Sequence, residues 1–116
     1  MNYNKSIKIA ETKIIKNNRV DTFEIRMTEH SYNRMHERGI DENVIAGNII
    51  ALGDKINDIN KNGYDEAAII DKVNNVAIIF AVYANKEINE NIVKIITVIN
   101  KSNVWVKDNT KILNIN

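Results

Sequence analysis

The chain has 116 residues, of which 44% are hydrophobic, and a formal net charge of +1 at pH 7. This length supports one hydrophobic core and excludes several large domains. No apolar run approaches the roughly 20 residues that cross a bilayer, and residues 1–9 are too polar for a secretory signal. We therefore expect a cytoplasmic protein with no membrane contact, and the lack of cysteine excludes thiol catalysis and thiolate metal sites.

The near-neutral charge hides a segregation along the chain. Residues 1–40 carry eight basic and five acidic residues, residues 41–92 carry four and nine, and residues 93–116 carry four and one. If the two ends meet in the fold, they form a weakly basic side that permits nucleic-acid contact without requiring it. The total charge argues against a tight, sequence-independent RNA binder.

The first two expected elements are strands. Apolar residues alternate over residues 7–16 with one interruption, which predicts a bulged strand, and Asn17-Asn18 is a turn signal. Residues 20–27 have a period of two, so the pair is expected to form a hairpin that leads into a helix. The alternative is that residues 1–18 are a frayed tail.

Two helices are expected next. Thr28 is a good N-cap, Glu29 complements the positive helix end and Gly39 suits a left-handed C-terminus, which predicts a helix over 28–38. Asp41 caps a second helix that Gly53 closes, and Ile40 acts as a hydrophobic pin between the two helices. The second helix buries a stripe formed by Ile45, Ile49 and Leu52.

The first helix gathers groups that can do chemistry. At about 100° per residue, one third of its circumference holds His30, Arg34, Glu37 and Arg38. The side chains expected to point toward the core are Ser31, Tyr32 and Met35. An imidazole beside two permanent cations and a carboxylate can bind and process a phosphodiester. The alternative is a solvated face with ion pairs four residues apart.

Strands are expected over the rest of the chain. The expected segments are a weak edge strand at 55–60, a strand at 64–71, central strands at 76–84 and 92–99, and a short edge strand at 104–107. Asn74-Asn75 marks a turn between two of them. The order predicts an α+β domain in which an N-terminal hairpin and two consecutive helices precede three to four antiparallel strands.

The remaining polar and aromatic residues carry weaker signals. His36 lies about 240° around the helix from His30, so the two cannot share a metal ion, and we interpret His36 as a surface or partly packed residue. Trp105 is expected to pack in the core against the helix pair, with a base-stacking platform or a partner anchor as the alternatives. The residues expected to form a solvated acidic rim are Asp54, Asp58, Asp65 and Glu66. No metal or other cofactor is expected.

One set of residues resembles a known family. It comprises His30, Arg34-Met35, Arg38-Gly39-Ile40, Ile45, Gly53-Asp54 and, much later, Ile96-Thr97-Val98-Ile99. This pattern resembles the domain-of-unknown-function 4258 family, which is similar to the BrnT and RelE group of small RNase toxins. The resemblance makes 23–107 the family-like core and 1–22 an N-terminal extension or hairpin arm.

The resemblance implies a metal-independent ribonuclease toxin or a catalytically silent binding module on the same fold. In the first case His30 is the base or acid, Arg34 and Arg38 hold the phosphate, and Glu37 orients a group or acts as a base. The partners would be RNA and a cognate antitoxin or other protein. In the second case the chain is an immunity, antitoxin or phage counter-defence protein that binds a protein or a small nucleotide.

Further substrate contacts are expected from outside the helix. Thr97, Tyr64 and Tyr83 are expected to supply hydrogen-bond donors from the sheet, and Trp105 is the candidate for base stacking. The chain departs from the resemblance in its charge, because toxins of this group tend to be clearly basic. That departure weakens the expectation of tight RNA binding.

Overall fold

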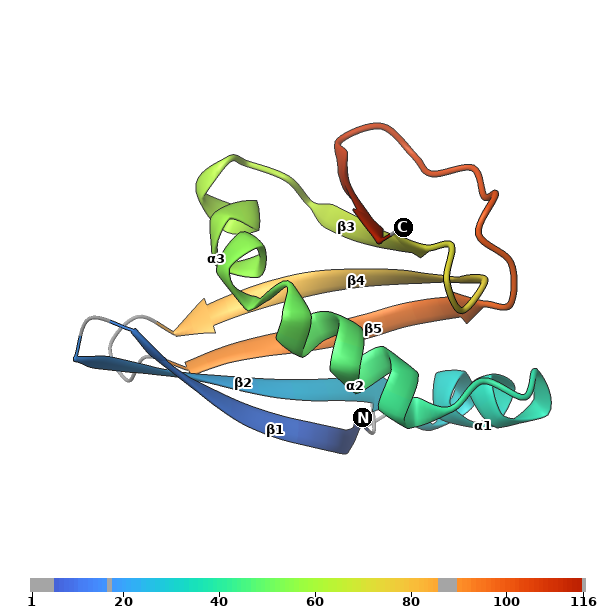
Figure 1. The fold of residues 1–116 in the computed structure, drawn as a ribbon, viewed down its shortest axis with the longest axis horizontal. Helices are drawn as coiled ribbons and strands as arrows, with labels where there is room; N and C mark the ends of the chain where they lie inside the picture. The colour runs from blue at the N-terminus through green and yellow to red at the C-terminus, as the bar shows by residue number, and fades with distance from the viewer. Residues whose placement is uncertain (1–5, 17, 86–89, 116) are drawn as a thin grey trace, which may run out of the picture.

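A computed structural model describes residues 6–16, 18–85 and 90–115. The chain begins with a hairpin, continues through a helical region and ends with four further strands (Figure 1). The hairpin and the four strands form one six-stranded sheet covered by helices, which confirms the predicted α+β class. The elements are β1 (Ser6–Lys16), β2 (Arg19–Thr28), α1 (Glu29–Glu37), α2 (Glu42–Ala51), α3 (Gly53–Lys61), β3 (Glu66–Asp71), β4 (Val76–Asn85), β5 (Glu90–Ile99) and β6 (Thr110–Ile115).

The sheet has the strand order β1-β2-β5-β4-β3-β6. Strands β2 and β5 are parallel, as are β3 and β6, and the other pairs are antiparallel, so the sheet is mixed. β1 pairs with β2 and shifts register between Lys8 and Ala10, which confirms the predicted hairpin and bulge. The frayed-tail alternative is therefore wrong for residues 6–16, while residues 1–5 lie outside the described chain.

The ends of α1 follow the predicted capping pattern. The Thr28 hydroxyl accepts a hydrogen bond from the Ser31 backbone N–H at 3.1 Å. At the other end Gly39 has a φ of 70°, and the Ile40 N–H donates to the Met35 carbonyl at 3.1 Å. Glycine reaches this left-handed conformation without a steric penalty, so the helix ends there and the chain turns toward α2.

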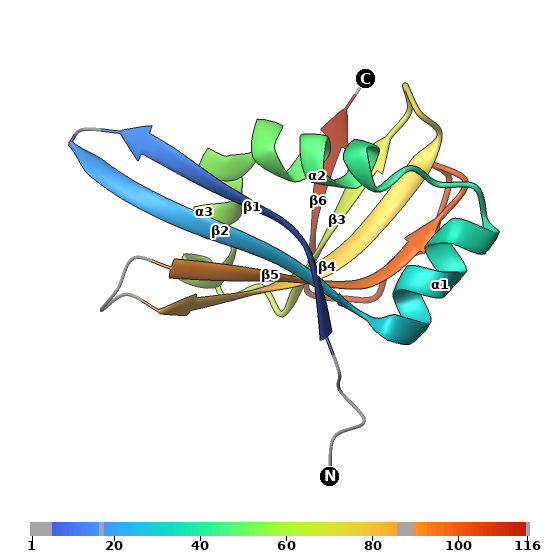
Figure 2. The same cartoon turned by 90° about the horizontal axis from the view of Figure 1, so that it is seen from below.

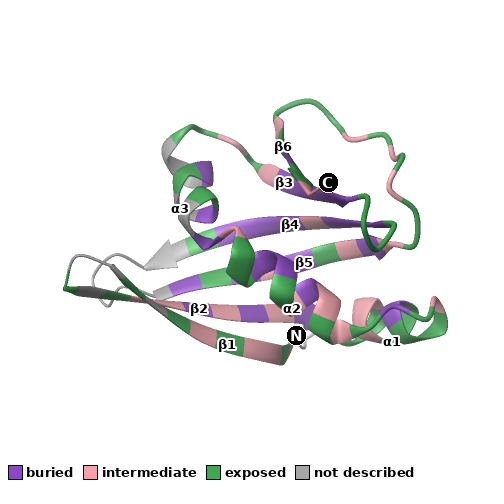
Figure 3. Ribbon diagram, viewed as in Figure 1, coloured by how far each residue is buried: buried purple, intermediate pink, exposed green. Residues whose placement is uncertain are grey.

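The main core lies between one face of the sheet and the helices α2 and α3 (Figures 2 and 3). Alternate residues of β2 supply it with Phe23, Ile25 and Met27, as the period of two predicted. The helices contribute Ile45, Ile49, Ile56 and Ile59. A smaller cluster of Ala68, Ile70 and Ala77 lies apart from this core, where Val104 and Val106 cover it.

The predicted strand at 55–60 is wrong, because this segment belongs to the helix α3. The second helix does end just before Gly53, as predicted, but Gly53 is also the first residue of α3. The backbone N–H groups of Lys55 and Ile56 both donate to the Leu52 carbonyl, at 2.9 and 3.0 Å, so a new helix starts where α2 ends. Burial of Ile56 and Ile59 stabilises this continuation.

The C-terminal edge strand was predicted in the wrong place. Residues 104–107 form a loop, and the edge strand is β6. Trp105 is 86% exposed, so its predicted core packing is wrong. The physical reason is the alternation of the loop, which turns Val104 and Val106 inward onto the smaller cluster and the indole outward.

A buried carboxylate ties α2 to the turn between β3 and β4. Asp71 is fully buried and accepts four hydrogen bonds, of 2.8 to 3.0 Å, from Asn48, Val73 and both nitrogens of Asn74. Burial acts to raise the pKa of Asp71, but these hydrogen bonds outweigh it and hold the pKa below its ordinary value of 3.8.

Within the described residues, no helix is long and apolar enough to span a bilayer.

Candidate functional site

The candidate site lies where β2 gives way to α1. The parallel pairing of β2 with β5 runs from Thr22–Glu90 to Met27–Ile95 and stops there, because the chain enters the helix after Thr28. The second half of β5 continues beyond this point. α1 lies beside it in place of a strand, as Figure 2 shows.

Two side chains, one in α1 and one at its C-cap, donate hydrogen bonds to backbone carbonyls of β5 beyond the end of its pairing with β2. The Ser31 hydroxyl donates to the Ile96 carbonyl at 3.1 Å, and the Arg38 guanidinium donates to the Val98 carbonyl. Thr28 supports the first contact, because its hydroxyl donates to the Ser31 Oγ at 3.0 Å. These bonds fix both ends of α1 against one strand, so the side chains between them have a defined position.

A β-bulge in β5 lies at the same place. Ile95 is opposite Phe80 and Thr97 is opposite Ile79, so Ile96 is an extra residue in the ladder. A bulge bends its strand and redirects side chains, and such bulges are frequent beside functional sites. Here the bulge falls at the point where the Ile96 carbonyl accepts from α1.

Between α1 and the bulge is a hollow of about 200 Å³, which we call the α1–β5 hollow. It is lined by His30, Ser31 and Arg34 from α1, by Arg38 at the C-cap of α1, and by Ile96, Thr97 and Val98 from β5. None of these residues is acidic. A positive local charge follows, because the two arginines each contribute a guanidinium cation.

The lining side chains differ in how far they are engaged. His30 and Arg34 are exposed, and neither has an ion pair in the ranges that the structure describes. Arg38 is half-buried and holds the Val98 carbonyl. Arg34 therefore has its donors open to a ligand, whereas Arg38 also helps to build the site.

A second hollow of about 280 Å³ adjoins this one, because Arg38 lines both. Its other polar side chains include Asn74, Asn75 and Asn100, from the turns at the ends of β3, β4 and β5. Amide side chains both donate and accept hydrogen bonds, so they suit the edges of nucleic-acid bases.

The structure brings together four of the eight predicted site residues, namely His30, Arg34, Arg38 and Thr97. Glu37, although it shares their sector of the predicted helix, is exposed and does not line the hollow. Of the three predicted aromatic contacts, Tyr64 lines a different pocket. Tyr83 is 56% exposed and pairs with Ile92, near the opposite end of β5 from Thr97, and Trp105 is exposed on the loop before β6.

Sequence reasoning missed Ser31, Ile96 and Val98. Ser31 was expected to point toward the core, but it is only half-buried and lines the hollow. At about 100° per residue it lies only about 20° from Arg38 on the helix, and this was the available signal. The two β5 residues take part through backbone carbonyls, which no side-chain pattern reveals.

His36 is exposed and its ring meets the Tyr32 ring edge-on, with 4.5 Å between centroids, which confirms the interpretation of a surface or partly packed residue. Over the described ranges, no three His, Asp or Glu side chains lie close enough together to hold a metal ion.

Comparison with protein-family models, with curated proteins and with solved structures found no match to this chain.

Proposed function

We propose that the chain is a metal-independent endoribonuclease that binds an RNA phosphodiester in the α1–β5 hollow. The observation that carries this proposal is that His30, Arg34 and Arg38 line one open hollow with Thr97. The resemblance to BrnT- and RelE-like toxins points to the same activity and remains a prediction.

The chemistry needs few groups. Cleavage begins when a base removes the 2′-hydroxyl proton, and the oxygen then attacks phosphorus as the bond to the 5′ oxygen breaks. The products are a 2′,3′-cyclic phosphate and a 5′-hydroxyl, which takes its proton from a general acid or from water. The phosphate gains negative charge in the transition state, so nearby fixed cations accelerate the reaction.

The exposed imidazole of His30 is the base in this proposal, because the only carboxylate on its predicted helical sector, Glu37, does not line the hollow. Arg34 presents its planar fork of N–H donors to the phosphate oxygens. Arg38 adds positive charge from a position fixed by the Val98 carbonyl, and Thr97 adds a hydroxyl from the strand.

The size of the site indicates what it recognises. A hollow of about 200 Å³ is smaller than the roughly 300 Å³ at which small-molecule pockets begin, so it accommodates a phosphate and part of a sugar. A neighbouring base would lie in the adjoining hollow with Asn74, Asn75 and Asn100. We therefore expect recognition mainly through the RNA backbone, with limited sequence preference.

A second candidate function is a binding module without catalysis, such as an immunity, antitoxin or phage counter-defence protein. Two observations favour it. The Arg38 guanidinium already donates a hydrogen bond to the Val98 carbonyl of the same chain, and the net charge of +1 provides little general attraction for RNA. The exposed Trp105 would serve such a module as a protein-binding anchor, because tryptophan is enriched at interface hot spots.

The test is RNA cleavage by the purified protein in the presence of a chelator, with detection of 2′,3′-cyclic phosphate ends. We expect His30→Ala and Arg34→Ala each to lower the cleavage rate by about 100-fold or more. Lys13→Ala, which changes an exposed lysine of β1, is the matched control and should keep the full rate.

Expression in a bacterial host gives a second readout. The wild-type chain should arrest growth, and the His30 and Arg34 variants should relieve the arrest while staying folded by circular dichroism. If the wild-type chain neither cleaves RNA nor arrests growth, or if the variants are as active as wild type, the nuclease proposal fails and the binding module becomes the better account.

A further inference from the structure

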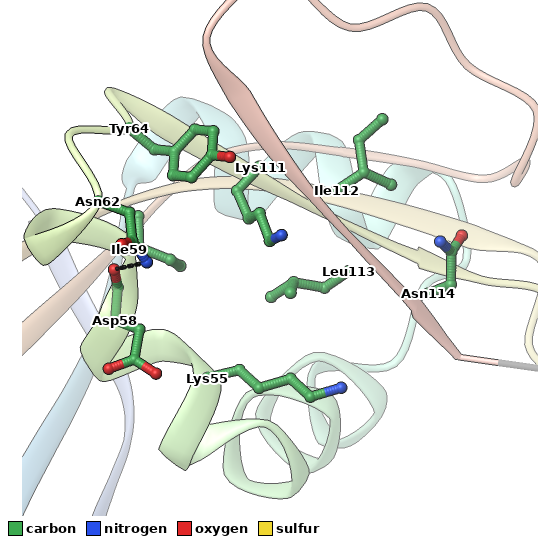
Figure 4. Close-up of a pocket in the computed structure, with 9 residues that line it drawn as sticks. All are labelled: Lys55, Asp58, Ile59, Asn62, Tyr64, Lys111, Ile112, Leu113 and Asn114. Carbon is green, nitrogen blue, oxygen red and sulfur yellow. Dashed lines mark hydrogen bonds between the residues drawn. The ribbon is translucent and has the colours of Figure 1, made fainter.

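A pocket lined by described residues lies between α3 and β6, and we call it the α3–β6 pocket. It encloses about 500 Å³ and shares no residue with the α1–β5 hollow (Figure 4). Strands β4 and β3 separate β5 from β6 in the sheet, so the two sites are on different parts of the molecule. The proposed nuclease chemistry makes no use of this pocket.

The middle of the α3–β6 pocket is apolar. Ile59 of α3 and Leu113 of β6 line it, and both are almost fully buried. Tyr64, on the segment that joins α3 to β3, also lines the pocket. A planar or apolar ligand group can bury its surface against these side chains, which favours binding by the hydrophobic effect.

Two lysines bring positive charge to the same space. Lys55 of α3 and Lys111 of β6 extend into the gap between the two elements in Figure 4. The Lys111 Nζ lies 5.7 Å from the centre of the Tyr64 ring, and neither lysine has an ion pair with another described residue. By contrast, Lys107 pairs with Glu66 at 3.2 Å. The charges of Lys55 and Lys111 are therefore available to an anion.

The other end of the pocket offers hydrogen-bond acceptors. Figure 4 shows the Asp58 carboxylate at the end away from the two ammonium groups, with Asn62 beside it. The Asn62 Nδ2 already donates to the Asp58 backbone carbonyl at 2.9 Å, so the Asn62 side-chain oxygen and the Asp58 carboxylate remain as acceptors. The pocket thus has a cationic end, an apolar middle and an accepting end.

We propose that the α3–β6 pocket binds a nucleoside monophosphate whose base carries an amino group. The phosphate lies between Lys55 and Lys111, the base covers Ile59 and Leu113, and the amino group donates to Asp58. A volume of about 500 Å³ is within the range of small-molecule sites. Guanine suits this end best, because its N1–H and N2–H groups match the two oxygens of a carboxylate.

The same chemistry has two sources, a free nucleotide and the 5′-phosphorylated end of an RNA strand. The test follows the backbone amide signals of residues 62–64 and 111–114 by nuclear magnetic resonance during titration with GMP. We expect saturable shifts in these signals, and binding weakened about tenfold or more in Lys55→Gln and Lys111→Gln. Lys13→Gln, at the opposite edge of the sheet, should bind GMP like wild type.

Matched ligands test each part of the pocket. Guanosine lacks the phosphate and inorganic phosphate lacks the base, and each should bind at least about tenfold more weakly than GMP. UMP, which has no amino group, should also bind more weakly. A short 5′-phosphorylated RNA that binds more tightly than GMP assigns the pocket to RNA ends, and one that binds equally or more weakly assigns it to free nucleotides.

Two results would overturn the proposal. One is the absence of saturable shifts at about 10 mM GMP. The other is an equal effect of the Lys55, Lys111 and Lys13 substitutions. The His30→Ala variant should bind GMP like wild type, so failure of the nuclease proposal and failure of this one are separate outcomes.

Discussion

Two polar clusters of this fold differ in how completely the protein itself satisfies them. Asp71 is fully buried and accepts four hydrogen bonds from Asn48, Val73 and Asn74. In the α1–β5 hollow, His30 and Arg34 are exposed and have no ion pair with another described residue. The first cluster uses its hydrogen bonds to hold α2 on the sheet, whereas the second keeps its donors available to a ligand.

The largest expected effect on folding comes from the closed cluster. Asp71→Ala leaves the buried Asn48 amide without its acceptor and removes the hydrogen bonds that hold the turn at Val73 and Asn74, so we expect the free energy of unfolding to fall by about 3 kcal/mol. Urea denaturation measures this change. Asp65→Ala removes an exposed carboxylate and should stay within about 0.5 kcal/mol of wild type. Equal losses in the two variants would contradict the assignment of Asp71 as a structural anchor.

Acid should remove part of the same stabilisation. The folded state holds the pKa of Asp71 below 3.8, so the unfolded state binds its proton at a higher pH than the folded state does. The contribution of Asp71 is therefore complete above about pH 5 and is lost as the pH falls through 3.8 toward the folded pKa. Unfolding curves between neutral and acid pH should lose stability more steeply in wild type than in Asp71→Asn. Parallel curves would count against this linkage.

The smallest effect separates the two arginines of the open cluster. Arg38→Ala removes a charged donor from the Val98 carbonyl, which should lower the free energy of unfolding by about 1.5 kcal/mol. Arg34→Ala removes an exposed side chain and should change it by less than about 0.5 kcal/mol. If Arg34 proves as important for folding as Arg38, its donors are occupied by the protein and are not available to a phosphate.

Local signals predicted the first half of the fold well. Thr28, Gly39 and Asp41 are found in the capping positions that their chemistry favours, and the alternation of β2 identified its buried face. These features depend on neighbouring residues alone, so a single sequence contains them.

The errors arose where a strong local signal was overridden. Gly53 indicated the end of the whole helical region, but it ends only α2, because the apolar stripe of Ile45, Ile49, Leu52, Ile56 and Ile59 keeps helical spacing across it. Because this spacing continues through Ile56 and Ile59, it predicts the helix α3. Similarly, β6 follows Asn109, whose φ of 63° makes the turn that two other asparagines make elsewhere in the chain. The hydrophobic residues Val104–Val106 gave a stronger strand signal than the turn at Asn109, so the edge strand was predicted too early in the chain.

The candidate site was predictable only in part for a related reason. The helical period placed His30, Arg34 and Arg38 on one side of α1, and this arrangement is local. The other wall of the hollow comes from β5, whose contribution depends on a bulge and on two backbone carbonyls. Such tertiary features have no side-chain signature, which is why Ser31 was expected in the core and Glu37 was expected in the site.

The parallel pairing of β2 with β5 determines when the hollow can exist during synthesis of the chain. Ser31 and Ile96 are 65 positions apart, and Arg38 and Val98 are 60 positions apart. After α1 has been synthesised, the ribosome must therefore add most of the remaining residues before either contact can form. Such long-range contacts close late and slowly, so the nascent polypeptide spends most of its synthesis without a formed hollow.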